Sequence, residues 1–381
     1  MVPAAFGMDS APPALLPSRS PAMHFGIAFP TYVEAWRDAE IAEANGFTHA
    51  WFYDSQLLYS DVWACMALAA EHTRSLVLGT LVAIPTNRIA PVTASAAATI
   101  NAIAPGRVVL GVGTGFTGRS TMGLRPMPVA AMEEYVAQVR GLLAGEDVLF
   151  REGEAERWIR LLHRDRARGF LNLDDPIPIH VAANGPKALA AAGRCGDGWV
   201  TVAQDPGGIA RGLEAVGAAA TQAGRAFSGS YTTLLTTGCI LRDGEAMASE
   251  RVVRRVGPVA VVAMHAIWET AHGGMGFGFA DDAAAKAYGD YVDAYAARHG
   301  SPPDRRYLDV HEGHMAYLKP GEEAFVNEGL LGISLVGRAD AVRQRVRDLR
   351  DAGVDNLALQ VMPGQARELV EEFARDVIAK L

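Results

Sequence analysis

The stretch LVLGTLVAIPTNRIAPVTASAAATINAIAPGRVVLGV, at residues 76–112, contains one complete strand–helix–strand unit. Residues 76–82 form a short, mainly apolar run, which predicts a buried strand. Residues 92–104 are rich in alanine and predict a helix that ends before Pro105 and Gly106. Residues 107–112 predict the next strand. This order favours two parallel strands joined by a helix.

The same alternation continues on both sides of this unit. Predicted strands lie at residues 24–29, 48–53, 76–82, 107–112, 179–182, 198–202, 231–240 and 356–360. Predicted helices lie at residues 34–45, 61–72, 92–104, 127–143, 186–195, 207–223, 339–352 and 366–380. Eight strands, most of them followed by a helix, predict an α/β fold of the (β/α)8 TIM-barrel class. Seven or nine strands would fit the pattern almost as well.

Three stretches depart from the alternation. Residues 1–22 are rich in proline, alanine and serine and predict a flexible N-terminal extension, which leaves residues 23–381 as a single barrel domain. Residues 145–178 are charged and irregular, and their basic run at 157–168 predicts a solvated helix face, with phosphate binding as the alternative. Residues 241–331 show helical runs without a clear strand, so we expect a helical insertion late in the chain.

Composition restricts the class of protein. The chain has 381 residues, 50% hydrophobic and 20% charged, which supports a large core and argues against disorder. The formal net charge is −8, so the chain lacks the excess of basic residues that is typical of nucleic-acid-binding proteins. The three cysteines lie far apart and are expected to be reduced. No apolar run approaches the ~20 residues that span a membrane. We therefore expect a cytoplasmic protein without nucleic-acid or membrane partners.

A glycine-rich segment, GVGTGFTG at residues 111–118, follows the predicted strand 107–112. Glycines at such a place let the backbone approach a flat ring or a phosphate closely. The dinucleotide fingerprint also needs a helix that opens on the glycines. Residues 119–128 contain two prolines, which predicts that no helix opens there. We expect a loop that touches a cofactor, with a plain turn as the alternative.

A second candidate is PIHVAANGPK at residues 178–187, where a strand ends and Asn184, Gly185 and Pro186 open a helix. The N–H groups of a first helical turn and the helix dipole together attract anions. An ordinary, well-capped turn explains the same residues equally well. Thr201 comes at the carboxyl end of the next predicted strand, where active sites of TIM barrels lie.

Three polar residues are candidates for catalysis. Asp54 closes the predicted strand 48–53 and is expected to orient a substrate or cofactor, or to cap a turn. His311 and His314 are expected to act in acid–base chemistry or to bind substrate, with a structural role as the alternative. Their spacing differs from H-E-x-x-H and Gly313 interrupts a helix, so no metal site is predicted.

Six segments, in this order, resemble the bacterial luciferase-like superfamily of flavin and deazaflavin oxidoreductases, and in particular its methylene-tetrahydromethanopterin reductase branch. They are HFGIAFP at 24–30, AEANGFTHAWFYDS at 42–55, LGTLVAIPTNRIAPVTASAAATI at 78–100, RVVLGVGTG at 107–115, PIPIHVAANGPKALAAAGRCGDGWV at 176–200 and VGRADAVRQRVRDLRDAGVDNLAL at 336–359. The resemblance spans nearly the whole chain from residue 23 onward.

The resemblance implies a TIM barrel whose cofactor, FMN or coenzyme F420, lies at the carboxyl ends of the strands. It implies that the ring system lies among Asp54, Leu81, Val82, Ala83, Thr114 and Gly115, with a non-proline cis peptide near Leu81 and Val82. It places the cofactor phosphate near Ala183, Asn184, Gly185, Pro186 and Thr201.

The chain also departs from the family pattern. The sugar-phosphate dehydrogenases of the superfamily carry a glutamate directly after G-T-G, where this chain has Phe116. They carry a phosphate-binding lysine where this chain has Asp205, so glucose-6-phosphate is not an expected substrate. The reductase branch also has an acid after its glycine turn. The acid–base group is therefore expected elsewhere, at His314, Tyr135 or Arg125.

These observations lead first to an FMN-dependent monooxygenase that acts on a small organic substrate and receives reduced FMN from a partner flavin reductase. The first alternative is an F420-dependent reductase or dehydrogenase that transfers a hydride. The second is a non-catalytic cofactor-binding barrel subunit, whose cavity Phe116 and Trp63 would fill. A metal-dependent barrel hydrolase is disfavoured, because only Asp54 is clearly placed as a ligand. We expect a homodimer.

Overall fold

The computed structural model describes residues 23–225, 230–272 and 282–381. The extension predicted for residues 1–22 and part of the insertion, residues 273–281, lie outside the described residues. No helix in the described ranges is long and apolar enough to cross a membrane.

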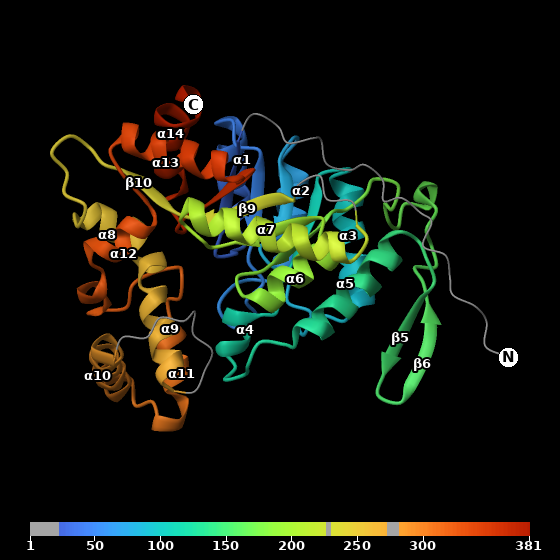
Figure 1. Ribbon diagram of the computed structural model, residues 1–381, viewed down its shortest axis with the longest axis horizontal. Helices are drawn as coiled ribbons and strands as arrows, with labels where there is room; N and C mark the ends of the chain where they lie inside the picture. The colour runs from blue at the N-terminus through green and yellow to red at the C-terminus, as the bar shows by residue number, and fades with distance from the viewer. Residues whose placement is uncertain (1–22, 226–229, 273–281) are drawn as a thin grey trace.

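Eight parallel strands close into a barrel in the order β1-β12-β9-β8-β7-β4-β3-β2, which confirms the predicted TIM-barrel class (Figure 1). The strands are β1 (His24–Phe29), β2 (His49–Phe52), β3 (Val77–Thr80), β4 (Val108–Val112), β7 (Ile179–Ala182), β8 (Gly198–Thr201), β9 (Tyr231–Thr236) and β12 (Asn356–Gln360). The pairing of β1 with β12 closes the barrel, with His24 opposite Asn356. All eight lie where the sequence predicts a strand.

The side chain of Trp51 explains why two neighbouring strands of the barrel carry glycine. Trp51 is fully buried, and its Nε1 donates a hydrogen bond to Oδ1 of Asn356 at 3.0 Å. A Cβ atom at Gly79 would lie 2.3 Å from the Trp51 ring, and one at Gly26 would lie 2.7 Å from it. Glycine is therefore required on both strands that flank β2, because the indole occupies the space of their side chains.

Helices surround the barrel and bury their apolar faces against the strands (Figure 1). They are α1 (Ala35–Ala44), α2 (Val62–His72), α3 (Ala90–Ile103), α5 (Val129–Leu143), α6 (Pro186–Cys195), α7 (Pro206–Gln222), α13 (Ala339–Ala352) and α14 (Ala366–Asp376). Helix α6 packs tightly against α7, where a Cβ at Gly193 would lie 2.3 Å from the carbonyl oxygen of Val216. Small residues at this contact allow the two backbones to approach closely.

The charged stretch after α5 forms a hairpin that projects from the barrel, made of β5 (Val148–Glu152) and β6 (Ala155–Ile159). The helix predicted for residues 157–168 is wrong, because residues 157–159 belong to β6, residues 160–165 form neither helix nor strand, and only the short 3-10 helix η1 (Arg166–Arg168) is helical. The chain reverses at Gly153, whose φ of +58° is favourable for glycine, and Val148 then pairs with Ile159. Most of residues 157–168 are exposed to solvent, where basic side chains are equally well hydrated in a helix and in an extended chain, so they do not specify a helix.

The predicted strand 231–240 is two strands. After β9, the chain leaves the barrel as β10 (Gly238–Ile240) and pairs in parallel with β11 (Leu335–Gly337). Between β10 and β11 lie α8 (Glu250–Ala260), α9 (Val262–Ala271), α10 (Asp282–His299), α11 (Arg306–His311) and α12 (Glu328–Ile333). These helices share a second apolar core around Val252, Val256 and Tyr288, and they lie to one side of the barrel (Figure 1).

Candidate functional site

Every residue that the sequence places at the cofactor lies at the carboxyl end of one of five strands. In the barrel these strands are consecutive, in the order β8-β7-β4-β3-β2. Thr201 ends β8, residues 183–186 follow β7, residues 114–115 follow β4, residues 81–83 follow β3, and Asp54 follows β2. The fold therefore brings the whole predicted set to one edge of the barrel, although these positions span about 150 residues of sequence.

The segment after β3 lies against the glycine-rich segment after β4. The peptide bond between Leu81 and Val82 is cis, as the resemblance implied. Ala83 N donates to the carbonyl oxygen of Gly111 at 2.8 Å, and Gly113 N donates to that of Ala83 at 3.1 Å. A Cβ at Gly113 would lie 2.6 Å from Val82 Cγ2. This glycine is thus explained by close packing of the two segments, and contact with a cofactor stays a prediction.

A short helix, α4 (Phe116–Ser120), begins directly after Gly115. The prediction that no helix opens on these glycines is therefore wrong. Gly115 has a φ of +81°, which turns the chain sharply out of β4, and α4 ends well before the prolines at 126 and 128. Since five residues separate the end of α4 from the first of these prolines, the prolines neither prevent the helix nor set its length.

Asp54 joins the ends of β2 and β3. Its Oδ2 accepts a hydrogen bond from the backbone N–H of Ile84 at 3.0 Å. Burial raises the pKa of this carboxyl, and the hydrogen bond from Ile84 opposes that effect. The side chain is half-buried, so it fixes the loop after β3 and still borders the mouth of the barrel.

The first turn of α6 is open to solvent. No side chain of the described residues caps it, and no described atom lies within 4 Å of a Cβ built on Gly185. Asn184 Oδ1 accepts from Thr201 Oγ1 at 3.2 Å, which ties the end of β8 to the turn. The next helix, α7, differs because Asp205 caps it by accepting from Gly208 N at 2.6 Å. The uncapped N–H groups of α6 and the helix dipole can hold an anion.

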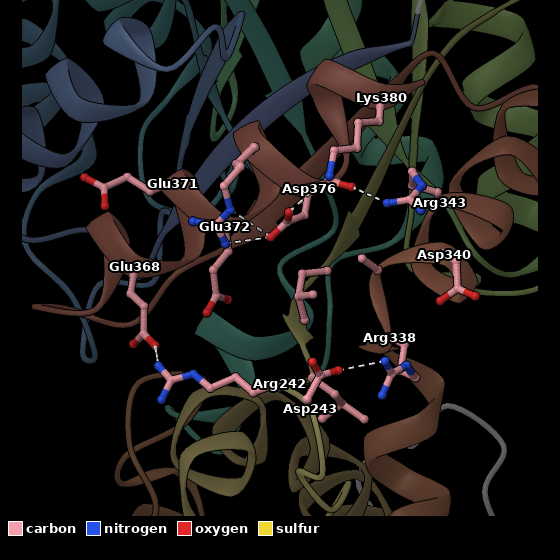
Figure 2. A pocket seen from close by; sticks show the side chains of 14 residues that line it. Arg242, Asp243, Arg338, Asp340, Arg343, Glu368, Glu371, Glu372, Asp376 and Lys380 are labelled. Carbon is pink, nitrogen blue, oxygen red and sulfur yellow. Dashed lines mark hydrogen bonds and ion pairs between the residues drawn. The ribbon is translucent and has the colours of Figure 1, made fainter.

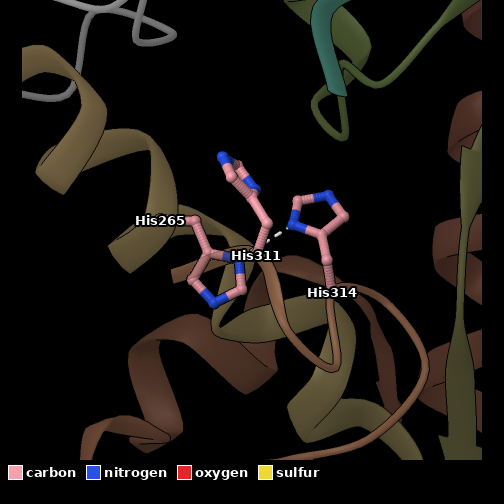
Figure 3. Close-up of side chains that lie close together, drawn as sticks. All are labelled: His265, His311 and His314. Atoms are coloured by element: carbon pink, nitrogen blue, oxygen red, sulfur yellow. Dashed lines mark hydrogen bonds between the residues drawn. The ribbon is translucent and has the colours of Figure 1, made fainter. Parts of the chain in front are cut away.

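Three buried histidines come together beside this edge (Figure 3). His311 and His314 were candidates from the sequence, and His265 on α9 was not. His265 Nδ1 lies 2.8 Å from His314 Nδ1. His265 Nε2 lies 3.2 Å from Glu322 Oε1, and His311 Nε2 lies 2.8 Å from Glu269 Oε1. We call His265, His311 and His314 the histidine cluster.

Burial keeps two of the three rings neutral. It lowers the pKa of His265 to about 4, and it lowers the pKa of His314 well below its ordinary value. Burial alone would raise the pKa of Glu322, but the hydrogen bond from His265 and the charge of Lys319 lower it to about 2. Glu322 is thus an ionised acceptor beside a neutral His265.

Hydrogen bonds connect the histidine cluster to the barrel. Tyr59 OH donates to the carbonyl oxygen of His314 at 2.6 Å, and Gln360 Nε2 donates to that of Met315 at 2.5 Å. Thr117 Oγ1 on α4 lies 3.4 Å from His314 Nε2. A pocket of about 370 Å³ borders the cluster, with Tyr59, Thr121, His311, Glu312, His314 and Tyr317 among its lining residues. The late helical segment therefore brings ionisable groups to the mouth of the barrel.

The other sequence candidates lie elsewhere. Tyr135 is buried between α5 and α3, where its OH donates to Thr93 Oγ1 at 2.6 Å and burial raises its pKa to about 12. Arg125 is exposed in the loop after α4. Trp63 packs in the core between helices and barrel and does not line the pocket.

A larger pocket of about 730 Å³ lies among β10, α13 and α14 and contains none of the predicted site residues (Figure 2). Its charged side chains pair with one another: Arg242 contacts Glu368 at 2.9 Å, and Arg338 contacts Asp243 at 2.8 Å. This mutual pairing leaves no reason to place the candidate site there.

Comparison with known proteins gives a consistent picture. A family model described as luciferase-like monooxygenase matches residues 14–356. The chain is 33% identical over 208 residues to 5,10-methylenetetrahydromethanopterin reductase of Methanolobus tindarius, covering 53% of this chain and 61% of that protein. It is 33% identical over 200 residues to F420-dependent hydroxymycolic acid dehydrogenase of Mycobacterium tuberculosis, covering 49% of this chain and 53% of that protein. The matched region thus spans less than two thirds of each relative.

Solved structures share the fold at low identity. F420-dependent tetrahydromethanopterin reductase of Methanopyrus kandleri superposes with a TM-score of 0.66 at 21% identity, over 94% of this chain and 99% of that one. The oxygenating constituent of 3,6-diketocamphane monooxygenase of Pseudomonas putida, in complex with FMN, superposes with a TM-score of 0.64 at 17% identity, over 94% and 99%.

Proposed function

This chain belongs to the luciferase-like monooxygenase family, and from that premise we propose that it is an oxidoreductase that binds coenzyme F420 at the carboxyl ends of β2, β3, β4, β7 and β8. The observation that carries the proposal is the uncapped first turn of α6, which lies on the same barrel edge as the paired segments after β3 and β4. One element suits the phosphate of such a cofactor and the other suits its ring.

The residues present fit a cofactor of this type. The N–H groups at the start of α6 offer hydrogen bonds to a phosphate, and Thr201, whose hydroxyl donates to Asn184 Oδ1, holds the turn before them in place. Gly113 packs against Val82 and Gly115 against Ile84, which holds the segments after β4 and β3 together, and we propose that this joint surface faces the flat ring. When bound, F420 would accept or deliver a hydride, whereas the chain's own residues would orient the ring and exclude water.

The choice of F420 over FMN rests on the sequence relatives. The hydroxymycolic acid dehydrogenase at 33% identity is named as F420-dependent, and so is a glucose-6-phosphate dehydrogenase of Nakamurella multipartita that is 39% identical over 142 residues. The second match covers 36% of this chain and 40% of that protein. Since Asp205 replaces the lysine expected for a sugar phosphate, we propose a carbonyl, imine or alkene substrate.

We propose His314 as the group that exchanges a proton with the substrate. Its Nε2 faces α4 through Thr117, and its ring lines the pocket beside the barrel mouth. Phe116 stands where the resemblance leads us to expect an acid, so another group must carry the proton. This residue also favours a second candidate function, an FMN-dependent monooxygenase supplied by a partner flavin reductase, because oxygen chemistry does not need that acid. A homodimer is proposed for either function.

Cofactor titration tests the proposal. Purified protein is titrated without oxygen with F420, with oxidised FMN and with reduced FMN, and binding is followed by cofactor fluorescence. Selective binding of F420 supports hydride transfer. Selective binding of reduced FMN supports the monooxygenase instead and calls for a search for oxygen-dependent turnover. Binding of neither cofactor contradicts both functions and favours a non-catalytic barrel.

A further inference from the structure

We propose that His265, His311 and His314 bind a divalent transition-metal ion, Zn²⁺ in the first instance, at the edge of the pocket beside the barrel mouth. The three residues come from two separate parts of the late helical segment, and each is buried. This proposal rests on the histidine cluster alone and does not depend on which cofactor the barrel binds.

The positions of the ring nitrogens suit a metal ion. One nitrogen from each ring lies within 4.8 Å of the other two (Figure 3). Zinc binds histidine nitrogens at ~2.0–2.1 Å in tetrahedral sites, which places its ligands about 3.3 Å from one another. The 2.8 Å separation of the Nδ1 atoms of His265 and His314 is slightly shorter than that spacing. Small movements of the rings would therefore complete the site.

One of these nitrogens has no other function in the described structure. His311 Nδ1 is buried and has no hydrogen-bond partner among the described residues. Buried polar atoms are nearly always paired with a protein group, a water molecule or an ion. Because His311 Nε2 is already bonded to Glu269 at 2.8 Å, the free lone pair of Nδ1 is left to accept a ligand.

Carboxylates orient two of the rings in the manner of known metal sites. His265 Nε2 donates to Glu322, and His311 Nε2 donates to Glu269. A proton on Nε2 leaves a lone pair on Nδ1 of the same neutral ring, which is the form that binds a metal. Glu322 is itself held by Lys319 Nζ at 2.8 Å and by Tyr288 OH at 2.5 Å. The outer shell of hydrogen bonds is thus already built.

Metal binding must displace one proton. Since the Nδ1 of His265 is an acceptor, the 2.8 Å contact requires a proton on the Nδ1 of His314. Binding of the ion to both Nδ1 atoms removes that proton, and the neutral His314 ring then carries its proton on Nε2. The displaced proton moves from Nδ1 to Nε2 of the same ring, so the balanced change is one Zn²⁺ bound and no proton released by the histidines. His314 Nε2 consequently changes from an acceptor to a donor toward Thr117, 3.4 Å away.

The proposed ion keeps a position for an external ligand. The protein supplies three nitrogens, whereas zinc prefers four ligands, and His311 and His314 both line the 370 Å³ pocket. Three protein ligands with an open fourth position are typical of sites that bind water or a substrate oxygen. A substrate that carries a carbonyl or carboxylate oxygen is the chemistry this position would accept.

Calorimetric titration of tag-free, chelator-treated protein with Zn²⁺ tests the proposal. We expect one equivalent to bind, and titrations in two buffers of different ionisation enthalpy should give nearly the same heat at pH 6, because the histidines release no proton and a zinc-bound water, with a pKa of ~7, stays mostly neutral there. His265→Gln and His311→Gln should each weaken binding at least about 100-fold, with Co²⁺ absorption as a second readout. His163→Gln, which changes an exposed histidine outside the cluster, is the control and should bind like the unaltered protein.

Substitution in the outer shell guards against misfolded variants. Glu269→Gln leaves all three histidines in place and should weaken Zn²⁺ binding ~10–100-fold. Absence of stoichiometric binding, or binding that survives His265→Gln and His311→Gln unchanged, would show that His265 and His314 simply share a proton. The F420 and FMN titrations are measured on the same metal-free protein, so failure of the metal site and failure of the cofactor site are seen separately.

Discussion

Replacing Gly185 with tryptophan tests the phosphate end of the proposed cofactor site. Gly185 precedes α6 with φ −99° and ψ 161°, a conformation open to any residue, and no described atom lies within 4 Å of its Cβ position. The indole would therefore occupy the solvent in front of the first helical turn without displacing the protein. Gly185→Trp should block an anion there and leave the barrel folded.

The size of the effect follows from the helix terminus. Pro186 has no N–H, so Lys187 and Ala188 supply the first-turn donors. Two charge-assisted hydrogen bonds at ~1.5–3 kcal/mol each give about 3–6 kcal/mol, so the Kd of the cofactor should rise at least about 100-fold. Loss of a glycine cap should change the free energy of unfolding by no more than about 1 kcal/mol.

The assay is the oxygen-free fluorescence titration with whichever cofactor the unaltered protein binds, together with thermal unfolding. Gly289→Trp on α10 is the matched control, since no described atom lies within 4 Å of its Cβ position either. It should bind the cofactor normally. Unchanged affinity in Gly185→Trp would refute the phosphate site. Weak binding together with a large loss of stability would instead show that the turn is needed for folding.

Three further predictions concern the barrel itself. Burial lowers the pKa of His180 to about 4 against the raising effect of Asp197, so the unfolded chain binds more protons below its ordinary pKa of ~6.5. The stabilising contribution of the neutral, buried His180 to the free energy of unfolding is complete above pH ~6.5 and is lost as the pH falls toward 4. In urea unfolding between these pH values, His180→Leu should reduce the change in the free energy of unfolding by up to ~1.4 kcal/mol per pH unit. An unaltered slope would contradict this. Gly79→Ala should destabilise the fold by ~1–3 kcal/mol in urea unfolding, because its Cβ would lie 2.3 Å from the buried Trp51 ring, and wild-type stability would show that the indole can move. Asp54→Ala should cost ~1–2 kcal/mol by leaving a backbone N–H after β3 without its acceptor, whereas Asp54→Asn should restore most of that loss in the same measurement.

Local patterns are sufficient for the strands and helices of the barrel. Short apolar runs such as residues 76–82 mark strands buried on both faces, and Pro105 with Gly106 marks the end of a helix. They fail where composition fits two conformations. The composition of residues 157–168 suits an exposed helix as well as an extended chain, and the pairing of Val148 with Ile159 shows only in the fold that residues 157–159 belong to a hairpin.

The histidine cluster shows a different limit. His311 and His314 are visible as a pair in the sequence, but His265 lies on another helix within an apolar stretch that signals only burial. Likewise, nothing in the sequence around Glu269 and Glu322 indicates that they accept hydrogen bonds from these histidines. The metal-ligand spacing that the sequence lacks is supplied by packing of α9 against α11 and the loop that follows it.

The sequence by itself determined the repeating strand–helix units, and with them the barrel and the edge at which Asp54, residues 81–83, residues 114–115 and residues 183–186 meet. This was possible because parallel strands joined by helices all direct their carboxyl ends to one side. Only the tertiary structure decided that the uncapped start of α6 is open to solvent and which three imidazoles share one space. Those features depend on distances between segments far apart in the chain, and residue order alone does not encode such distances.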